Sequence, residues 1–381
     1  MRQTNKIRKG IAWLLCTVLV LGILPMLPQM SMQISAAENA ASVFVDGVEL
    51  HAGGNEYFKN GDTADSGATG TYEDHSAYYD TAGELWLNNL EAHTIKANGN
   101  LTIYVCNNQE TNTNIVTATQ NETAIEVTGY LTIQYGGYGE TGSLTVESDG
   151  KEAIQAGSGM TVSDGVEVKV RAKSGATAIS SGGVLKIDGI RTKLEAASDG
   201  STGKGIFAQQ SIYVKNSAVL TAFGGAAAYE SPSGIDKSGY GYEDYNVFTG
   251  DAAPGTQAAK DTALDGYKYI RIEPTGVANV KTLTELQAAA QNQYISLINV
   301  MNDITITDTV YVRRAVTIQS PDVSNVSKLI RGKSHTDVIL DFDGANGHKS
   351  DVVTLKNIIV DGNKDGNTQT ASPALKSKSI L

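Results

Sequence analysis

Hydrophobic and polar residues alternate in short strands that recur at nearly constant spacing between residues 123 and 222. Four blocks begin with a small residue followed by isoleucine, at Ile125, Ile154, Ile179 and Ile206. Successive isoleucines are 29, 25 and 27 residues apart. A period of this size indicates a repeat protein, in which each unit packs on the next one.

Each block contains three short strands, and Gly, Ser, Asp and Asn fill the joints between them. In the block that begins at Ile154, the second strand covers residues 160–162 and the third covers residues 166–170. One such block cannot bury its apolar face, whereas coils stacked about 4.8 Å apart can. We therefore predict an all-β protein with the fold of a right-handed parallel β-helix. The alternative of separate hairpins would not require a constant block length.

The third strands of neighbouring blocks also predict which side chains lie above one another. Alternate side chains point inward, and the inward columns are Val166/Ile190/Ala218, Val168/Thr192/Leu220 and Val170/Leu194/Ala222. The outward side chains form one column of Glu147, Arg171 and Glu195, with Glu167 over Arg191 and Lys169 over Lys193. Opposite charges on neighbouring strands stabilise such a stack, and the two lysines are the like-charge exception.

Residues 282–292 carry a helical pattern that interrupts the strands. Thr282 and Glu285 fit a capping box, and Leu283, Leu286 and Ala290 share one face. Short alternating strands resume after this helix and continue to residue 360. We therefore predict two β-helical modules, residues 42–275 and 279–381, with the short helix capping the first rung of the second module.

The end of the chain resembles the beginning of a strand, at residues 376–381. We therefore expect the second module to be incomplete and the chain to be a form of a longer protein. Residues 42–79 form the entry to the first module, with a short strand at 43–45, and residues 267–272 form its closing strand.

The N-terminus has the order of a secretory signal peptide. Basic residues come first, an apolar run covers residues 11–27, and Ser35-Ala36-Ala37 fits a cleavage site. Residues 1–37 are therefore predicted to be removed. The alternatives are a membrane anchor, which would have to tolerate Pro25, and a lipoprotein attached through Cys16.

Charge and cysteine content limit the partners and the location expected for the chain after cleavage. Removal of residues 1–37 takes away four positive charges and changes the net charge from −11 to −15. Nucleic acid and anionic lipid repel a chain this acidic, so we expect no nucleic-acid partner and no membrane binding after cleavage. Cys106 is the one cysteine left, which excludes an intramolecular disulfide. We predict an extracellular protein, secreted or associated with the cell wall.

Three stretches of the first module resemble a family of secreted proteins from anaerobic Gram-positive bacteria. They are Tyr79-Asp80 with Gly83-Glu84-Leu85-Trp86-Leu87-Asn88-Asn89, the rungs Asn100-Leu101-Thr102-Ile103 and Leu131-Thr132-Ile133, and Phe248-Thr249-Gly250 with Tyr267-Lys268-Tyr269-Ile270. The resemblance covers residues 42–274. It implies carbohydrate-binding β-helix modules of the pectate-lyase-like fold.

The second module resembles the first rungs of pectate-lyase-like and adhesin β-helices. The motif that carries this resemblance is Ile358-Ile359-Val360-Asp361-Gly362-Asn363. It implies a second β-helix of the same kind, since the motif mainly encodes the geometry of a rung.

Tyrosines are the candidate residues for sugar binding. The chain has 17 Tyr against 6 Phe and 2 Trp, and a tyrosine offers a flat ring together with a hydrogen-bonding hydroxyl. Two clusters carry this hypothesis, Tyr130/Tyr135/Tyr138 among glycines and Tyr240/Tyr242/Tyr245 beside Glu243 and Asp244. The alternative is that these tyrosines simply cover the ends of strands.

Catalytic and metal motifs are weakly represented. The five histidines show no metal spacing, and the acids nearest to a lyase site are Asp341, Asp343 and Asp361, with Arg331 upstream. Turn and edge roles explain these acids equally well, so we predict that the protein is not an enzyme.

A calcium-binding turn is the one cofactor alternative that the sequence leaves open. Asp361, Asn363 and Asp365 copy the first half of a calcium loop, but Ser372 stands where the loop needs a glutamate. The other interpretation is an ordinary Gly/Asn turn. We expect no cofactor, with a calcium-bound turn as the alternative.

The leading functional hypothesis is a non-catalytic, surface-attached protein that binds a polysaccharide or cell-surface glycan on its stacked strands. One alternative is an adhesin or structural stalk that displays a distal domain. The other is a fragment of a polysaccharide lyase or hydrolase. The sequence does not indicate the oligomeric state.

Overall fold

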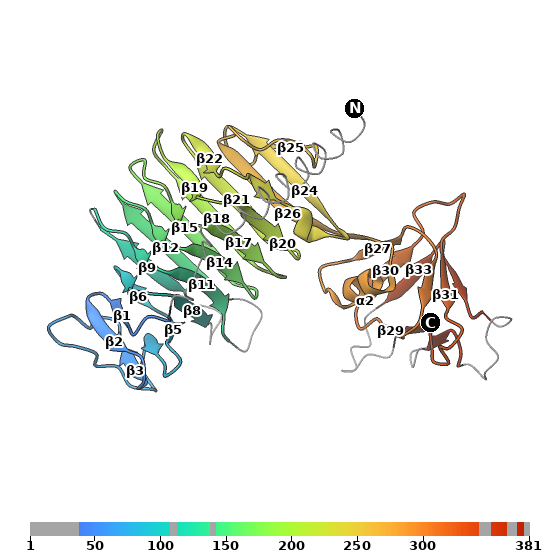
Figure 1. Ribbon diagram of the computed structural model, residues 1–381, viewed down its shortest axis with the longest axis horizontal. Coiled ribbons are helices and arrows are strands. Elements are labelled where there is room, and N and C mark those ends of the chain that lie inside the picture. The colour runs from blue at the N-terminus through green and yellow to red at the C-terminus, as the bar shows by residue number, and fades with distance from the viewer. Residues whose placement is uncertain are drawn as a thin grey trace, which may run out of the picture. The chain divides into compact units, whose positions relative to one another are not determined.

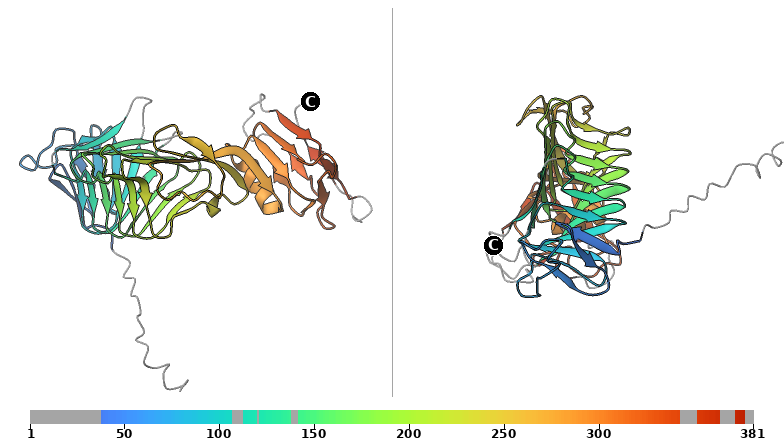
Figure 2. Two further views of the ribbon diagram at one scale, coloured as in Figure 1. Left: turned by 90° about the horizontal axis from the view of Figure 1, so that it is seen from above. Right: turned by 90° about the vertical axis from the view of Figure 1, so that its left-hand side faces the viewer.

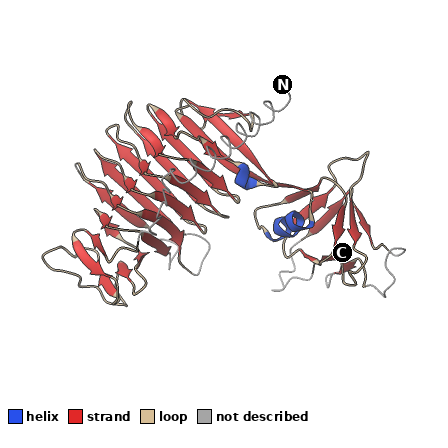
Figure 3. Cartoon of the chain, viewed as in Figure 1, coloured by secondary structure: helices blue, strands red, loops and turns tan. Residues whose placement is uncertain are grey.

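The computed structural model describes residues 38–106, 113–119, 121–137, 142–342, 352–363 and 372–376. They form a parallel β-solenoid of about nine turns with one short α-helix (Figures 1 and 3). The predicted fold class, a parallel β-helix, is therefore confirmed. The predicted signal peptide, residues 1–37, lies outside the described residues.

Three long sheets form the walls of the solenoid, and the chain visits the second, third and first sheet in turn in each coil. The first sheet has the order β2 (Val48–His51), β1 (Ser42–Val45), β7 (Ile95–Ala97), β10 (Ile125–Val127), β13 (Ile154–Ala156), β16 (Ile179–Ser181), β19 (Lys204–Ala208) and β22 (Ala227–Glu230). The second has the order β23 (Ile235–Asp236), β20 (Ile212–Lys215), β17 (Val184–Asp188), β14 (Gly159–Ser163), β11 (Tyr130–Tyr135), β8 (Leu101–Cys106), β5 (Glu84–Asn88), β4 (Ala77–Tyr79) and β3 (Glu56–Phe58).

The third sheet is the longest and continues past the first set of coils. Its order is β33 (Val353–Lys356), β30 (Val316–Gln319), β27 (Leu297–Val300), β26 (Tyr269–Val280), β21 (Val219–Gly224), β18 (Lys193–Ser198), β15 (Glu167–Lys173), β12 (Ser143–Asp149), β9 (Asn114–Ala118) and β6 (Glu91–Ala92), with β24 (Glu243–Gly250) and β25 (Thr256–Ala258) attached. Figure 2 shows the parallel strands of the first coils side by side.

The predicted column of isoleucines is confirmed in the first sheet. Ile125 pairs with Ile154, Ile154 with Ile179, and Ile179 with Ile206, and all four side chains are fully buried. Parallel pairing buries each apolar side chain against its neighbours above and below, which one coil alone cannot achieve. The constant block length in the sequence therefore reflects the circumference of one coil.

The predicted register of the third strands is wrong by two residues at β18. Glu167 pairs with Lys193, and Val168 pairs with Leu194. The inward columns are therefore Val168/Leu194/Leu220 and Val170/Ala196/Ala222. The physical reason is a turn before β18, in which Gly189 and Arg191 have φ angles of 99° and 67°.

This turn changes the outward pairs as well. Glu147 does face Arg171, as predicted, but Glu195 faces Lys169. The expected like-charge pair of Lys169 and Lys193 does not form, because Lys193 faces Glu167. Arg191 does not lie over Glu167. Its guanidinium instead donates hydrogen bonds to the Tyr294 hydroxyl at 2.5 Å and to Gln293 Oε1 at 3.0 Å.

Aromatic rings stack along the outer face of the second sheet where the solenoid begins. The rings of Trp86 and Tyr104 lie 4.1 Å apart with an interplanar angle of 9°, and Tyr78 stacks on the other side of Trp86 at 5.8 Å. These rings come from β4, β5 and β8, which are neighbours in the sheet. Because the stacked faces cover one another, we interpret this ladder as a stabilising feature of the entry segment.

The predicted helix is confirmed as α2 (Leu283–Gln291), with Thr282 as its N-cap. The Glu285 amide donates to Thr282 Oγ1 at 3.2 Å, and the Thr282 amide donates to Glu285 Oε2 at 3.1 Å. Leu286, Ala289 and Ala290 are buried, in a second core cluster that includes Ala278 and Leu340. A short 3₁₀ turn, η1 (Ser238–Tyr240), lies in the first set of coils.

Strands after α2 form two small parallel sheets beside the third sheet. One contains β28 (Ile304–Ile306), β31 (Lys328–Arg331) and β34 (Ile359–Asp361), and the other contains β29 (Val310–Tyr311), β32 (Leu340–Asp341) and β35 (Leu375–Lys376). The sequence predicted a β-helix here but did not identify β31, and β35 starts one residue before the strand start expected at residue 376. Among the residues that the structure describes, no helix has the length and hydrophobicity to cross a membrane.

Candidate functional site

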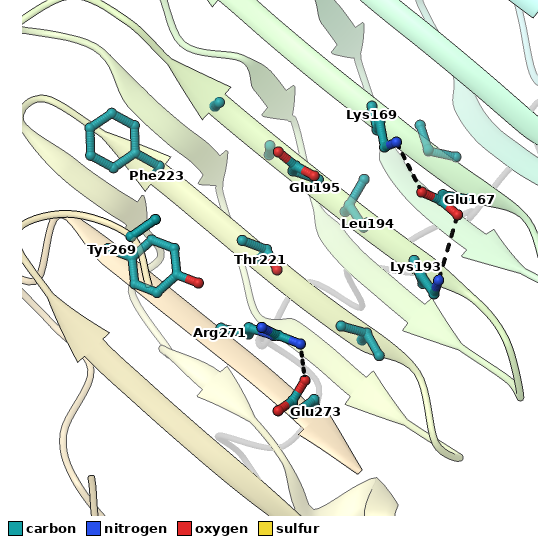
Figure 4. Close-up of a pocket in the computed structure, with 15 residues that line it drawn as sticks. Glu167, Lys169, Lys193, Leu194, Glu195, Thr221, Phe223, Tyr269, Arg271 and Glu273 are labelled. Atoms are coloured by element: carbon teal, nitrogen blue, oxygen red, sulfur yellow. Dashed lines mark hydrogen bonds and ion pairs between the residues drawn. The ribbon is translucent and has the colours of Figure 1, made fainter. Parts of the chain in front are cut away.

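A shallow groove of about 640 Å³ lies on the outer face of the third sheet, over β15, β18, β21 and β26 (Figure 4). Strand alternation places charged and aromatic side chains on this face, while Leu194 and its neighbours point into the core. The charged groups are Glu167, Lys169, Lys193, Glu195, Arg271 and Glu273, and the aromatic ones are Phe223 and Tyr269. We define this set as the third-sheet groove.

Two columns of paired residues give the groove its form. One runs from Lys169 through Glu195 and Thr221 to Arg271. In the other, the small residue Ala197 lies between Arg171 and Phe223. Short side chains between longer ones leave a hollow that runs across the strands.

Ion pairs hold most of the charges in place. Glu167 accepts from Lys169 at 3.2 Å and lies 3.6 Å from Lys193, and Arg271 forms an ion pair with Glu273. Partial burial opposes ionisation of Glu167, but the contacts with the two lysines outweigh it and lower the pKa of this carboxyl group. Glu167 is therefore an ionised carboxylate whose negative charge is balanced by the two lysines.

Aromatic side chains form the end of the groove nearest to β24. Tyr269 is buried, and this burial raises the pKa of its hydroxyl. The guanidinium of Arg271 lies 5.9 Å from the centre of the Phe248 ring on β24. The turn after β24 reaches Tyr269 through Gly255, where φ is 71° and a Cβ atom would lie 2.8 Å from the ring. This turn therefore needs glycine both for its conformation and for its close approach to the ring.

The groove combines side chains of the kinds found in sugar-binding sites. Its charged groups have the chemistry to exchange hydrogen bonds with hydroxyl groups, and Phe223 adds an apolar ring that is half-buried. The surface is open along the strand stack, so it suits an extended chain better than a small compact ligand.

The first predicted tyrosine cluster does not form one surface. Tyr130 and Tyr135 are the end residues of β11, and Tyr138 lies outside the described residues. The Tyr130 hydroxyl is 2.7 Å from Thr161 Oγ1. The ring of Tyr135 packs against the core, and its buried hydroxyl has no hydrogen-bond partner among the described residues. The structure therefore places Tyr135 at the end of a strand, as the alternative interpretation expected.

The second predicted cluster is divided between two cores. Tyr240 is 2 % exposed and its hydroxyl donates to the Ala218 carbonyl. Tyr245 packs on the Tyr240 ring at 4.7 Å, whereas Tyr242 packs against the second core cluster. Tyr240 is therefore part of the core and has no ring face for a ligand.

The acids considered for catalysis have structural contacts in the described residues. Asp341 is buried and lies 3.6 Å from Arg313 and 3.3 Å from Lys376. Arg331 is 1 % exposed and donates to the Ser372 carbonyl at 2.6 Å. Asp343 lies outside the described residues.

The candidate calcium turn has the contacts of an ordinary turn in its described part. Asp361 Oδ1 accepts the Asn363 amide at 2.8 Å, and Asn363 Nδ2 donates to the Arg331 carbonyl at 2.8 Å. Asp365 is not among the described residues. Within the described ranges, no group of three or more His, Cys, Asp or Glu side chains is placed to hold a metal ion.

Sequence reasoning did not identify the third-sheet groove. Glu195 and Phe223 come from consecutive coils, 28 residues apart, and in the structure Glu195 pairs with Thr221 while Phe223 pairs with Ala197. The signal was present in the outward positions of the third strands, where charged and aromatic residues alternate with aliphatic ones. The error of two residues at β18 left the same side chains on the outer face but gave them the wrong neighbours, such as Lys193 beside Lys169 instead of Glu167.

Comparison with known protein families finds similarity in the part of the chain that follows the groove. Residues 277–379 match the family model of the pectate lyase-like adhesive domain. No curated protein and no solved structure shows significant similarity to the chain. The match begins within β26 and covers the strands that follow α2. This part of the chain is therefore similar to pectate-lyase-like adhesive domains, which associates the protein with surface adhesins or polysaccharide-related β-helices.

Proposed function

We propose that the protein is a non-catalytic adhesin that binds a polysaccharide in the third-sheet groove. The observation that carries this proposal is the groove itself, in which charged side chains and the Phe223 ring line an open hollow across four stacked strands. The similarity of residues 277–379 to an adhesive domain supports it. The resemblance of residues 42–274 to carbohydrate-binding modules supports it as well.

The carboxylates of the groove favour binding over hydrolysis. A general acid at neutral pH needs a raised pKa, whereas the contacts with Lys169 and Lys193 lower the pKa of Glu167. Glu273 is paired with Arg271. Glu167 and Glu273 therefore serve to position neighbouring side chains, and Glu195 is the third carboxylate of the groove, with no ion-pair partner among the described residues.

Filling the groove tests the proposal. The variant Thr221→Trp puts a bulky ring in the middle of the hollow without touching the core, because Thr221 points outward. We expect the mature chain to bind polysaccharides on a glycan array and this variant to bind them at least about tenfold more weakly.

The matched control is Thr132→Trp, an outward position on β11 of the second sheet. This variant should bind like the wild type. Equal binding by the wild type and Thr221→Trp would contradict the assignment to the groove, and failure of the wild type to bind any polysaccharide would contradict the function.

A structural stalk is the second candidate, and one observation favours it. The single strand β26 pairs with β21 of the first coils and with β27 of the second set, so one sheet connects the two core clusters. A stalk predicts retention at the cell surface or binding to a host protein without affinity for any glycan, which the same array distinguishes.

A further inference from the structure

The pairing of charges in the third-sheet groove indicates which class of polysaccharide it accepts. The groove has three acidic and three basic side chains, Glu167, Glu195, Glu273, Lys169, Lys193 and Arg271. Total charge therefore does not select a ligand. Ligand selection depends instead on which of these side chains already form ion pairs with one another.

All three cations are bound to carboxylates within the groove. Lys169 and Lys193 both contact Glu167, and Arg271 contacts Glu273 (Figure 4). A carboxylate on the ligand would have to displace one of these side chains from its cation. Such an exchange contributes little free energy of binding, because one exposed ion pair replaces another.

Glu195 is different, because its side-chain carboxylate has no hydrogen bond or ion pair with any of the described residues. It is exposed in the middle of the hollow, where its register neighbours are Lys169 and Thr221. The amine of Lys169 is engaged with Glu167. The unpaired group of the groove is therefore a carboxylate, which accepts hydrogen bonds and repels other anions.

We infer that the groove selects an uncharged polysaccharide whose hydroxyl groups donate to Glu195, and that it discriminates against polyuronates. This inference rests on the polysaccharide-binding function proposed above. The net charge of −11 for the whole chain acts in the same direction, because it repels polyanions at longer range. Specificity arises here from a repulsive group as well as from attractive contacts.

Pairs of polymers with the same backbone and different charge test the inference. We would compare hydroxyethyl cellulose with carboxymethyl cellulose, and highly methyl-esterified homogalacturonan with its de-esterified form, by affinity electrophoresis at low salt. In each pair that binds, we expect the uncharged member to bind about tenfold more tightly. The difference should shrink at 1 M salt, where the screening length falls to about 3 Å.

The variant Glu195→Lys provides the internal test, with Glu195→Gln as its matched control. Because this side chain is exposed, neither change disturbs the core. Glu195→Lys should reverse the preference toward the charged member, and Glu195→Gln should reduce the discrimination without reversing it. An unchanged preference in Glu195→Lys would overturn the inference.

The outcomes separate the two proposals. Tighter binding of the charged members by the wild type would overturn the charge selectivity and leave polysaccharide binding intact. Absence of binding to every polymer on the array, charged or uncharged, would overturn the proposed function itself.

Discussion

Among individual residues, Glu243 is a buried carboxylic acid whose ionisation opposes folding. Its oxygens accept hydrogen bonds from Ser217 Oγ at 2.8 Å and from Asn292 Nδ2 at 2.9 Å. Burial is the largest influence on this group and raises its pKa above the usual value, although the hydrogen bonds oppose the rise. The folded state therefore binds a proton at Glu243 more readily than the unfolded state does.

This difference predicts a pH dependence of stability. Because the pKa of Glu243 is raised in the folded state, its contribution to the free energy of unfolding is fully present below the unfolded pKa, near 4.5, where the side chain is protonated in both states. This stabilising contribution is lost as the pH rises through the folded pKa and the buried group ionises. The change Glu243→Gln should remove this loss. Urea unfolding at pH 4 and pH 7 should therefore show that the variant gains stability relative to the wild type as the pH rises.

The comparison within each pH cancels the titration of all other groups, since the two proteins differ at one residue. If the difference in unfolding free energy between Glu243→Gln and the wild type were the same at both pH values, the raised pKa would be contradicted.

The residues of the proposed binding site were the least predictable part of the molecule. The abundance of tyrosine directed attention to Tyr240 and Tyr135, but both rings pack against core residues. Sequence alone does not distinguish a tyrosine that fills the end of a coil from one that faces solvent, because both positions follow the same alternation and both tolerate a polar hydroxyl.

Among structural elements, the repeating turn of the solenoid is the one that the sequence predicted best. The isoleucine column and the capping box of α2 are confirmed, and the strand predicted at 267–272 is present as the start of β26, which continues to Val280 instead of closing the module. They depend on local patterns and on a constant period. The register of β18 was wrong because Asp188-Gly189-Ile190-Arg191 continues the alternation of a strand while the backbone turns. Alternation cannot locate a turn whose residues keep the strand pattern.

Two substitutions test this register directly. Ile179 is fully buried in the first sheet, whereas Ile190, assigned by alternation to an inward column, is only half-buried. Ile179→Ala should lower the free energy of unfolding by about 2–5 kcal/mol, through lost burial and the cavity left behind. Ile190→Ala should lower it by about 1 kcal/mol or less.

Both values would come from urea denaturation followed by far-UV circular dichroism. Equal losses for the two variants would contradict the observed register and favour an inward position for Ile190.

At the scale of the whole molecule, one sheet runs through both core clusters. β26 enters it antiparallel to β21 and leaves it parallel to β27. The sequence predicted two modules from the helix and the change in pattern near residue 280, but the shared strand depends on pairing between distant segments. The chain thus places the third-sheet groove and the adhesive-domain similarity on one continuous scaffold.

The central claim, that polysaccharide occupies the third-sheet groove, can be measured through thiol protection. Residues 38–381 contain one native cysteine, Cys106, and burial raises the pKa of its thiol to about 11, so it reacts slowly near neutral pH. A thiol introduced by Thr221→Cys lies in the groove, and one introduced by Thr132→Cys lies on the second sheet. The rate of alkylation would be measured with and without a saturating polysaccharide chosen from the array. We predict about tenfold slower alkylation at position 221 and no change at position 132, whereas equal rates at position 221 with and without bound polysaccharide would contradict the account.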